Sequence, residues 1–374
     1  MPRFANYLCE GMRARGHQVA QWSPTASAYK LSTRAGLKKW LGYVDQYLLF
    51  PREVSRRIKA CPADTLFVFT DQALGPWVPL VANRPHVIHC HDFLAQHSAL
   101  GRIAENPTSW TGRTYQALIR RGYTQGANFI SVSQTTKKDL HQFLPTAPAS
   151  SEVVYNGLNQ LFTPFDTTQA RRTLSQKTGL DLSAGYLLHV GGNQWYKNRL
   201  GCIELYDAWR KLSASNTLPL LLVGEAPSEV VTNLRNASAF KQDIHLLSGF
   251  DDEAVRLAYA GATIFLFPSL AEGFGWPIAE AMAAGCPVLT TQEAPMTEVG
   301  GTAAFYIPRR PTTAAEAWAT AGAHVIQQVV DLSPAERQAA VAAGQANARR
   351  FESEAALDQI EAIYKTIVPS PSRR

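Results

Sequence analysis

Two glutamates frame a short glycine-containing loop in the last third of the chain. Glu272 directly precedes Gly273-Phe274-Gly275, and Glu280 follows a few residues later. A carboxylate accepts paired hydrogen bonds from vicinal hydroxyls, so one glutamate could hold a sugar and the other a ribose, on either side of a diphosphate. The two glycines let the backbone come close to such a ligand. This spacing therefore indicates a site for a sugar linked to a nucleoside diphosphate.

The sequence around these glutamates predicts a strand, a loop, a helix and a second strand. Pro277 suits the first helical turn, where its missing N–H costs nothing, and Gly285 suits the end of the helix. The start of such a helix offers free N–H groups and the positive end of the helix dipole to an anion. In the competing interpretation, Glu280 merely complements that dipole and Glu272 is a solvated loop charge. The assembled pattern favours the binding site.

Two other nucleotide-binding patterns are excluded. Gly273-x-Gly275 is followed at the third position by Ile278, where a dinucleotide fingerprint requires Gly or Ala. No other G-x-G-x-x-G and no Walker A loop occurs in the sequence.

Short apolar runs alternate with helix-like stretches along the whole chain, which predicts an α/β fold with parallel sheets. The predicted strands are residues 19–22, 66–70, 86–91, 129–133, 153–155, 186–190, 218–223, 244–247, 264–267 and 287–290. A chain of 374 residues suits two domains. We expect an N-terminal domain over residues 1–164, a second domain over 165–352, and a C-terminal helix with a loose tail over 353–374.

The segment from Glu272 to Val288 resembles the E-x7-E region of the family-4 retaining glycosyltransferases. Weaker similarities to that family lie at residues 88–93, 130–133, 154–157, 189–192, 197–198 and 223–224. The resemblance implies a GT-B fold, in which two Rossmann-like domains face each other across a cleft.

The resemblance also implies roles for the residues of the loop. Glu280 would bind the ribose of the donor, and Glu272 would bind hydroxyls of the transferred sugar. The amides of Phe274 and Gly275, beside Gly273, would meet the phosphates.

Further site residues follow from the weaker motifs. Lys197 would neutralise the diphosphate near Gly191 and Gly192, and His91 would lie at the cleft near the sugar. The family often carries an arginine where this chain has Gly192 or Tyr196, so we expect Arg199 to supply the second positive charge. In the competing interpretations, Lys197 is a surface lysine in a turn, and His91 is a core or strand-end histidine.

The sequence contains no Asp-x-Asp, so a divalent metal bridging the diphosphate is not indicated. We expect a metal-independent hexosyltransferase without a cofactor. Its donor would be a nucleotide-diphosphate sugar and its acceptor a glycan or a lipid-linked molecule, in surface-polysaccharide or glycoconjugate synthesis. Two alternatives stay open: a sugar-nucleotide 2-epimerase, and a degenerate GT-B subunit that binds sugar or supports assembly.

The formal net charge of +6 and the sequence pI near 9.0 fit nucleic acid, an anionic membrane or phosphorylated ligands. Residues 31–59 interleave basic with aromatic side chains, which suits an anionic membrane surface. A helix packed on the N-terminal domain with its charges in water explains the pattern equally well. We expect no nucleic-acid partner.

The location expected from the sequence is cytoplasmic, peripheral on the inner membrane face. The five cysteines are scattered, and neither a signal peptide nor an apolar run of about 18–20 residues is present.

The chain opens with a helix pattern, formed by Phe4, Leu8 and Met12, and no strand precedes it. In a doubly wound sheet the first strand is central. We therefore expect the first strand of the N-terminal sheet to be missing, leaving either a gap or strands closed together.

Overall fold

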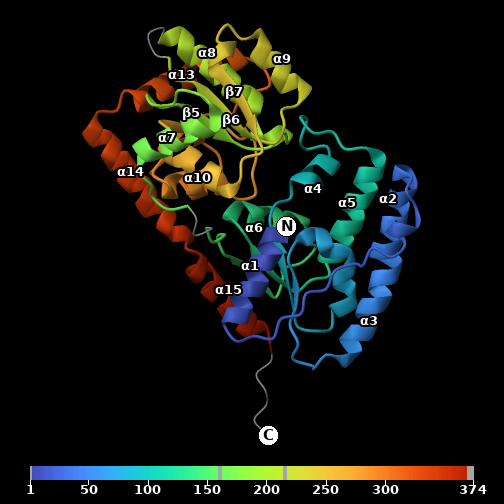
Figure 1. Cartoon of the computed structure of the whole chain (residues 1–374). Coiled ribbons are helices and arrows are strands. Elements are labelled where there is room, and N and C mark those ends of the chain that lie inside the picture. Colours follow the sequence, from blue (N-terminus) through green and yellow to red (C-terminus); the bar gives the residue numbers. More distant parts are fainter. Residues whose placement is uncertain (1, 159–161, 214–216, 369–374) are drawn as a thin grey trace. The chain divides into compact units, whose positions relative to one another are not determined.

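The computed structural model describes residues 2–158, 162–213 and 217–368 (Figure 1). The chain forms two compact units, one of Met1–Tyr155 with Glu354–Arg374 and one of Asn156–Ser353. The predicted boundary at 164/165 falls inside the second unit, and the C-terminal helix belongs to the first.

The first unit contains a parallel sheet of four strands in the order β1-β2-β3-β4. The strands are β1 (Phe67–Phe69), β2 (His86–Cys90), β3 (Asn128–Ser131) and β4 (Ser150–Val153). Ile88 of β2 lies opposite Phe69 of β1 on one side and opposite Phe129 of β3 on the other. Each strand therefore pairs with the next one along the chain, and the sheet has no gap between its described strands.

Three predicted strands of this unit are confirmed, at residues 66–70, 86–91 and 129–133. The strand expected at 153–155 forms earlier, as β4. The strand expected at 19–22 is wrong, because these residues pair with no neighbouring strand. Trp22 packs its ring 5.9 Å from the ring of Phe67, but its backbone forms no ladder with β1. Among the described residues before Phe67, none lies in a strand.

Helices surround this sheet. They are α1 (Pro2–Ala14), η1 (Tyr29–Leu31), α2 (Ala35–Val44), η2 (Asp45–Leu49), α3 (Phe50–Ala60), η3 (Gln72–Val81), α4 (Leu94–Ala99), α5 (Trp110–Tyr123), α6 (Gln134–Phe143) and α15 (Ser353–Ile367).

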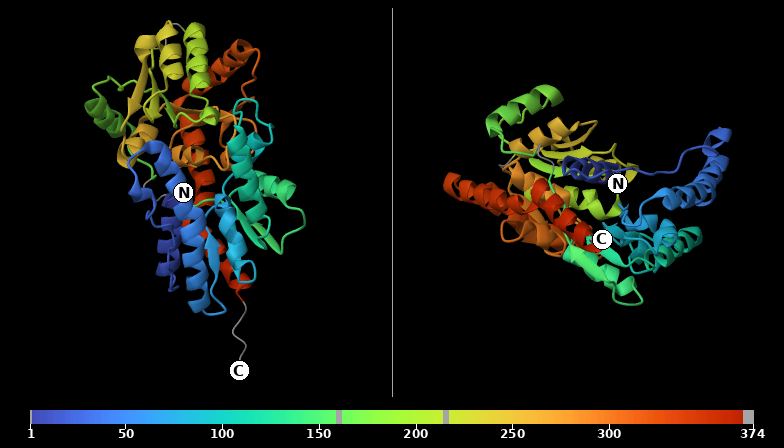
Figure 2. Two further views of the ribbon diagram at one scale, coloured as in Figure 1. Left: turned by 90° about the vertical axis from the view of Figure 1, so that its right-hand side faces the viewer. Right: turned by 90° about the horizontal axis from the view of Figure 1, so that it is seen from below.

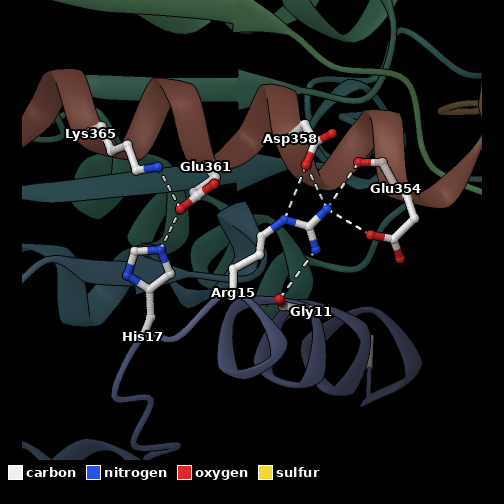
Figure 3. Close-up of polar contacts among 7 residues, drawn as sticks. All are labelled: Gly11, Arg15, His17, Glu354, Asp358, Glu361 and Lys365. Atoms are coloured by element: carbon white, nitrogen blue, oxygen red, sulfur yellow. Dashed lines mark hydrogen bonds and ion pairs between the residues drawn. The ribbon is translucent and has the colours of Figure 1, made fainter.

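The C-terminal helix α15 packs beside α1 in the first unit (Figures 1 and 3). Arg15 binds Glu354 at 2.8 Å and Asp358 at 2.7 Å, and the His17 ring lies 2.8 Å from Glu361 (Figure 3). Beneath these polar contacts, apolar side chains of both helices share one core cluster with strands β2 and β3. The C-terminal helix α15 therefore contributes to the same core cluster as the N-terminal helix α1.

The second unit contains a parallel sheet of six strands in the order β10-β9-β8-β5-β6-β7. The strands are β5 (Leu187–Val190), β6 (Leu220–Gly224), β7 (Ile244–Ser248), β8 (Ile264–Phe267), β9 (Val288–Thr291) and β10 (Phe305–Ile307). All five strands predicted in this half are confirmed, whereas β10 was not predicted. The order is that of a doubly wound sheet, whose direction of winding reverses between β5 and β8.

Helices cover both faces of the six-stranded sheet. They are α7 (Thr167–Thr178), η4 (Trp195–Lys197), α8 (Arg199–Leu212), α9 (Glu229–Ala237), η5 (Lys241–Asp243), α10 (Asp252–Gly261), α11 (Trp276–Ala283), α12 (Met296–Gly300), α13 (Ala315–Val330), α14 (Pro334–Ala348) and η6 (Arg349–Phe351). Figures 1 and 2 show α8, α9 and α13 on one face, and α7, α10 and α14 on the other. The apolar strands are therefore buried on both sides, as parallel sheets require.

Candidate active site

The candidate site lies where the winding of the six-stranded sheet reverses. Gly191 follows the end of β5, and the Glu272 loop follows the end of β8, which is the neighbouring strand. Ligands of doubly wound sheets bind at the carboxyl ends of the strands at this switch point. The topology therefore places the two most informative motifs of the second unit at one edge of its sheet.

Glycines let the backbones at this edge come together. Gly224 ends β6 with φ of +151°, and a Cβ atom there would lie 2.0 Å from the Gly191 carbonyl oxygen. A Cβ atom on Gly192 would lie 2.5 Å from the Gln194 side chain. A side chain at Gly224 would thus push the backbones of the loops after β5 and β6 apart, whereas one at Gly192 would displace mainly the Gln194 side chain.

The loop after β8 is held from three sides. Thr291 donates its hydroxyl to the Ser269 carbonyl oxygen at 2.7 Å, and the Leu270 amide donates to the Tyr196 carbonyl oxygen at 2.8 Å. Arg309 donates to the Leu270 carbonyl oxygen at 3.0 Å. The backbone that leads into Glu272 is consequently fixed before any ligand arrives.

Glu272 and Lys197 form an ion pair. The Lys197 Nζ atom lies 2.8 Å from Glu272 Oε1, and the Ser269 hydroxyl donates to the same oxygen at 2.9 Å. The lysine side chain is 16% exposed and the glutamate side chain 8% exposed. Lys197 Nζ also lies 5.1 Å from the centroid of the Phe267 ring. The structure thus brings two of the predicted catalytic residues into direct contact.

Asn198 positions Lys197 at the start of α8. Asn198 adopts a left-handed conformation with φ of +52°, accepts from the Gly201 amide at 3.1 Å and donates to the Pro268 carbonyl oxygen at 2.8 Å. This cap fixes the turn that carries Lys197 to the loop after β8.

Glu280 lies on α11, and Tyr259 of α10 contacts it. The Tyr259 hydroxyl donates to Glu280 Oε2 at 3.2 Å. Burial raises the pKa of Tyr259 well above its ordinary value, and the nearby Glu280 carboxylate raises it further. The phenol therefore stays protonated and serves as a donor that orients the carboxylate.

The loop between the two glutamates ends at Gly275, which precedes α11 with φ of +105°. Phe274 is buried, and its ring lies 5.7 Å from the ring of Trp276 and 5.5 Å from the ring of Phe351. This packing fixes Gly273–Gly275 at the N-terminal end of the helix, where the positive end of the helix dipole favours an incoming anion.

Arg199 is 3% exposed and points into the loops after β5 and β6. Its Nη1 atom donates to Asn193 Oδ1 at 2.8 Å and to the Glu225 carbonyl oxygen at 3.2 Å. The Glu225 carboxylate in turn accepts from the Asn193 amide at 3.1 Å. Burial lowers the pKa of Arg199, and the residue ties the two loops together.

His189 lies buried beneath this edge. Its Nδ1 atom is 2.9 Å from the Leu266 carbonyl oxygen, and a Cβ atom on Gly191 would lie 2.9 Å from its Nε2 atom. Burial, together with the nearby charges of Arg199 and Lys197, lowers the pKa of His189 to about 3. The ring is consequently neutral at physiological pH.

His91 lies in the first unit, whereas the other predicted site residues lie in the second. It follows β2, its Nε2 atom is 2.9 Å from the Thr70 carbonyl oxygen, and its ring centroid is 4.5 Å from that of Phe4. Burial lowers its pKa, so this ring too is neutral. Its expected place near a sugar stays a prediction.

Sequence reasoning missed several residues that support the site. Ser269 carried a weak signal, because it precedes Glu272 by three residues in the same motif. Tyr259 and Glu225 gave none, since they come from other parts of the unit and meet the site only through the fold.

Comparison with known proteins identifies two matching family models. Residues 184–328 match the model described as "Glycosyl transferases group 1", and residues 1–160 match "Glycosyltransferase Family 4".

Relatives of known function are also similar. The chain is 31% identical to O-antigen chain mannosyltransferase B of Escherichia coli over 185 residues, which cover 49% of this chain and 46% of that protein. It is 24% identical to phosphatidyl-myo-inositol mannosyltransferase of Mycobacterium leprae over 98% of this chain and 92% of that protein. The first of these matches thus spans about half the length of the relative.

Two solved structures share the fold. WaaG, a glycosyltransferase involved in lipopolysaccharide biosynthesis, has a TM-score of 0.70 at 19% identity, covering 97% of this chain and 95% of its own. Anabaena HepE, in complex with UDP, has a TM-score of 0.65 at 18% identity, covering 86% and 84%.

Proposed function

Since the chain belongs to glycosyltransferase family 4 and has the GT-B fold, we propose that it is a retaining glycosyltransferase that moves a sugar from a nucleotide-diphosphate donor to an acceptor. The observation that carries this proposal is the Lys197–Glu272 ion pair at the switch point of the doubly wound sheet, with Glu280 on the helix that follows.

Each part of the donor has a suitable partner in the second unit. The Lys197 ammonium and the amides at the start of α11 suit the diphosphate. Glu280, oriented by Tyr259, suits the ribose hydroxyls, and Glu272 suits hydroxyls of the sugar. Because Glu272 already binds Lys197 at 2.8 Å, the same lysine can link the sugar side of the site to the phosphates.

The proposed reaction needs stabilisation of a leaving diphosphate. The bond between the anomeric carbon and the β-phosphate oxygen breaks, while the acceptor oxygen attacks from the same face. A β-phosphate oxygen takes the proton of the acceptor. Lys197 and the start of α11 stabilise the negative charge that develops on the leaving group, without requiring a metal or a cofactor.

The proposed acceptor is a glycan or a lipid-linked molecule in surface-polysaccharide or glycoconjugate synthesis. The names of the relatives support this choice, since one refers to an O-antigen chain and another to phosphatidyl-myo-inositol. Among the described helices, none is long and apolar enough to cross a membrane. The proposed location is the cytoplasm, at the inner face of the membrane.

A thermal-shift screen of the purified protein against UDP-, GDP- and ADP-sugars tests the proposal. A donor at 100 times its dissociation constant should stabilise the protein by about 2.7 kcal/mol. Glu280→Gln removes the charge with little change in shape and should lose most of this shift. No shift with any donor, together with no release of nucleoside diphosphate, would refute the proposal. An epimerase would instead interconvert donor sugars, and a binding subunit would show a shift without turnover.

A further inference from the structure

Large apolar side chains are exposed in one stretch of the first unit. Six of the twelve exposed large hydrophobic residues in the described part of the chain lie between Tyr29 and Leu49, so apolar exposure is concentrated there. They are Tyr29, Leu31, Leu37, Trp40, Leu48 and Leu49. Leu31 is 81% exposed and Trp40 is 68% exposed. We call residues 29–49 the α2 surface.

The α2 surface has a regular geometry. Leu37 and Trp40 are three residues apart on α2 and share one side of that helix. Leu48 follows eight residues after Trp40, about two helical turns further along. Leu37, Trp40 and Leu48 therefore form a row along one side of α2 and η2, and Tyr29 and Leu31 lie on the preceding short helix η1.

Specific contacts anchor the other side of the segment. Buried Asp45 accepts the Ala28 amide at 2.7 Å and the Tyr29 amide at 2.8 Å. The Tyr47 hydroxyl donates to the Tyr115 hydroxyl at 2.9 Å, which joins η2 to α5. Figure 1 shows α2 running beside α5. The row of exposed apolar side chains is thus presented by an ordered element.

The charged side chains of the α2 surface are basic, apart from one buried aspartate. Lys30, Arg34, Lys38 and Lys39 lie within it, and Asp45 is the sole acidic residue between Glu10 and Glu53 in the sequence. Because Asp45 is buried and bound to backbone amides, it does not offset these cations at the surface. Two copies of this surface would repel each other, whereas an anionic surface would attract it.

We propose that the α2 surface binds an anionic lipid bilayer. The row of Leu37 and Trp40 enters the boundary between headgroups and acyl chains, and the lysines of α2 meet lipid phosphates. The binding adds to the proposed sugar transfer and does not depend on it.

Vesicle flotation of the full-length protein tests the proposal. The vesicles contain phosphatidylcholine alone, or phosphatidylcholine with phosphatidylglycerol. Wild type should float only with the anionic vesicles, and less at high salt. Each basic charge near an anionic membrane contributes about fivefold to binding. The double variant Lys38→Glu with Lys39→Glu removes two such charges and should therefore weaken binding by at least about 25-fold. Leu37→Ser with Trp40→Ser should also weaken it.

Matched controls lie in the second unit. Val230→Ser and Lys241→Glu change an exposed apolar and an exposed basic residue there and should float as wild type does. All variants should keep the wild-type thermal unfolding and the donor-induced shift, which separates this test from that of sugar transfer. Wild type that ignores anionic vesicles, or α2 variants that bind like wild type, would overturn the proposal. A self-association that the α2 variants abolish, without lipid binding, would also overturn it.

Discussion

Replacing Lys197 with alanine tests whether its charge serves the leaving diphosphate or only pairs with Glu272. Loss of one preorganised electrostatic contact at a reacting centre typically costs about 10²–10³ in rate. We therefore expect the release of nucleoside diphosphate, measured at saturating donor, to slow by about that factor.

The ion pair also predicts a change in stability. With side chains 16% and 8% exposed, the pair lies between exposed pairs, worth about 0–1 kcal/mol, and fully buried pairs, whose disruption costs about 3–5 kcal/mol. Lys197→Ala should thus lower the free energy of unfolding by roughly 1–3 kcal/mol, because it leaves Glu272 without its cation.

The double variant Lys197→Ala with Glu272→Gln separates the two roles. Removing the carboxylate charge as well should restore part of the lost stability, as a double-mutant cycle measures, but should not restore the rate. Recovery of turnover in the double variant, or a rate of Lys197→Ala within tenfold of wild type, would refute a role in stabilising the leaving group.

Four further predictions follow from the second unit and the buried histidines. Glu280→Ala should weaken donor binding by about 1.5–3 kcal/mol in calorimetry, and an unchanged affinity in a folded variant would contradict the ribose assignment. Tyr259→Phe should weaken the same binding by about 0.5–1.5 kcal/mol, through loss of the 3.2 Å hydrogen bond to Glu280, without abolishing it. Transfer should persist in EDTA, and complete loss restored by Mg²⁺ would contradict the phosphate contacts proposed above. Burial lowers the pKa of His89 and of His189 to about 3 in the folded chain, whereas both rings titrate near pH 6.5 in the unfolded chain. Below about pH 6.5 the unfolded chain therefore binds more protons than the folded chain, and the folded chain loses stability. Melting temperatures should fall between pH 7 and pH 5, and a flat profile would contradict this.

The sequence predicted the parts of the fold that depend on burial. Strands such as β5 and β8 are apolar runs buried on both faces, and their pattern is therefore local. β4 begins with Ser150 and was placed too late, since its polar residues carry little apolar signal. The three-residue β10 was missed because so short a run has no recognisable period.

The two glutamates of the candidate site were likewise predictable from the sequence, whereas their contacts with distant residues were not. Glu272 and Glu280 lie in one continuous motif, so their types and spacing were visible in the sequence. The contacts of Glu272 with Lys197 and of Glu280 with Tyr259 join distant segments, 75 and 21 residues apart. Such contacts depend on strand order, which no local pattern encodes.

The strand order also explains why two neighbouring cations differ in their surroundings. Lys197 precedes the left-handed Asn198 and reaches across to Glu272 on the loop after β8. Arg199 follows Asn198 as the first residue of α8 and points to Asn193 and the Glu225 carbonyl oxygen. Because of the turn at Asn198, the Lys197 side chain lies beside the proposed diphosphate site, and the Arg199 side chain lies in the loops that border it. We infer that Lys197 makes the direct contact with the donor, whereas Arg199 holds the loop that follows Gly191 in place and adds its charge from beneath the surface.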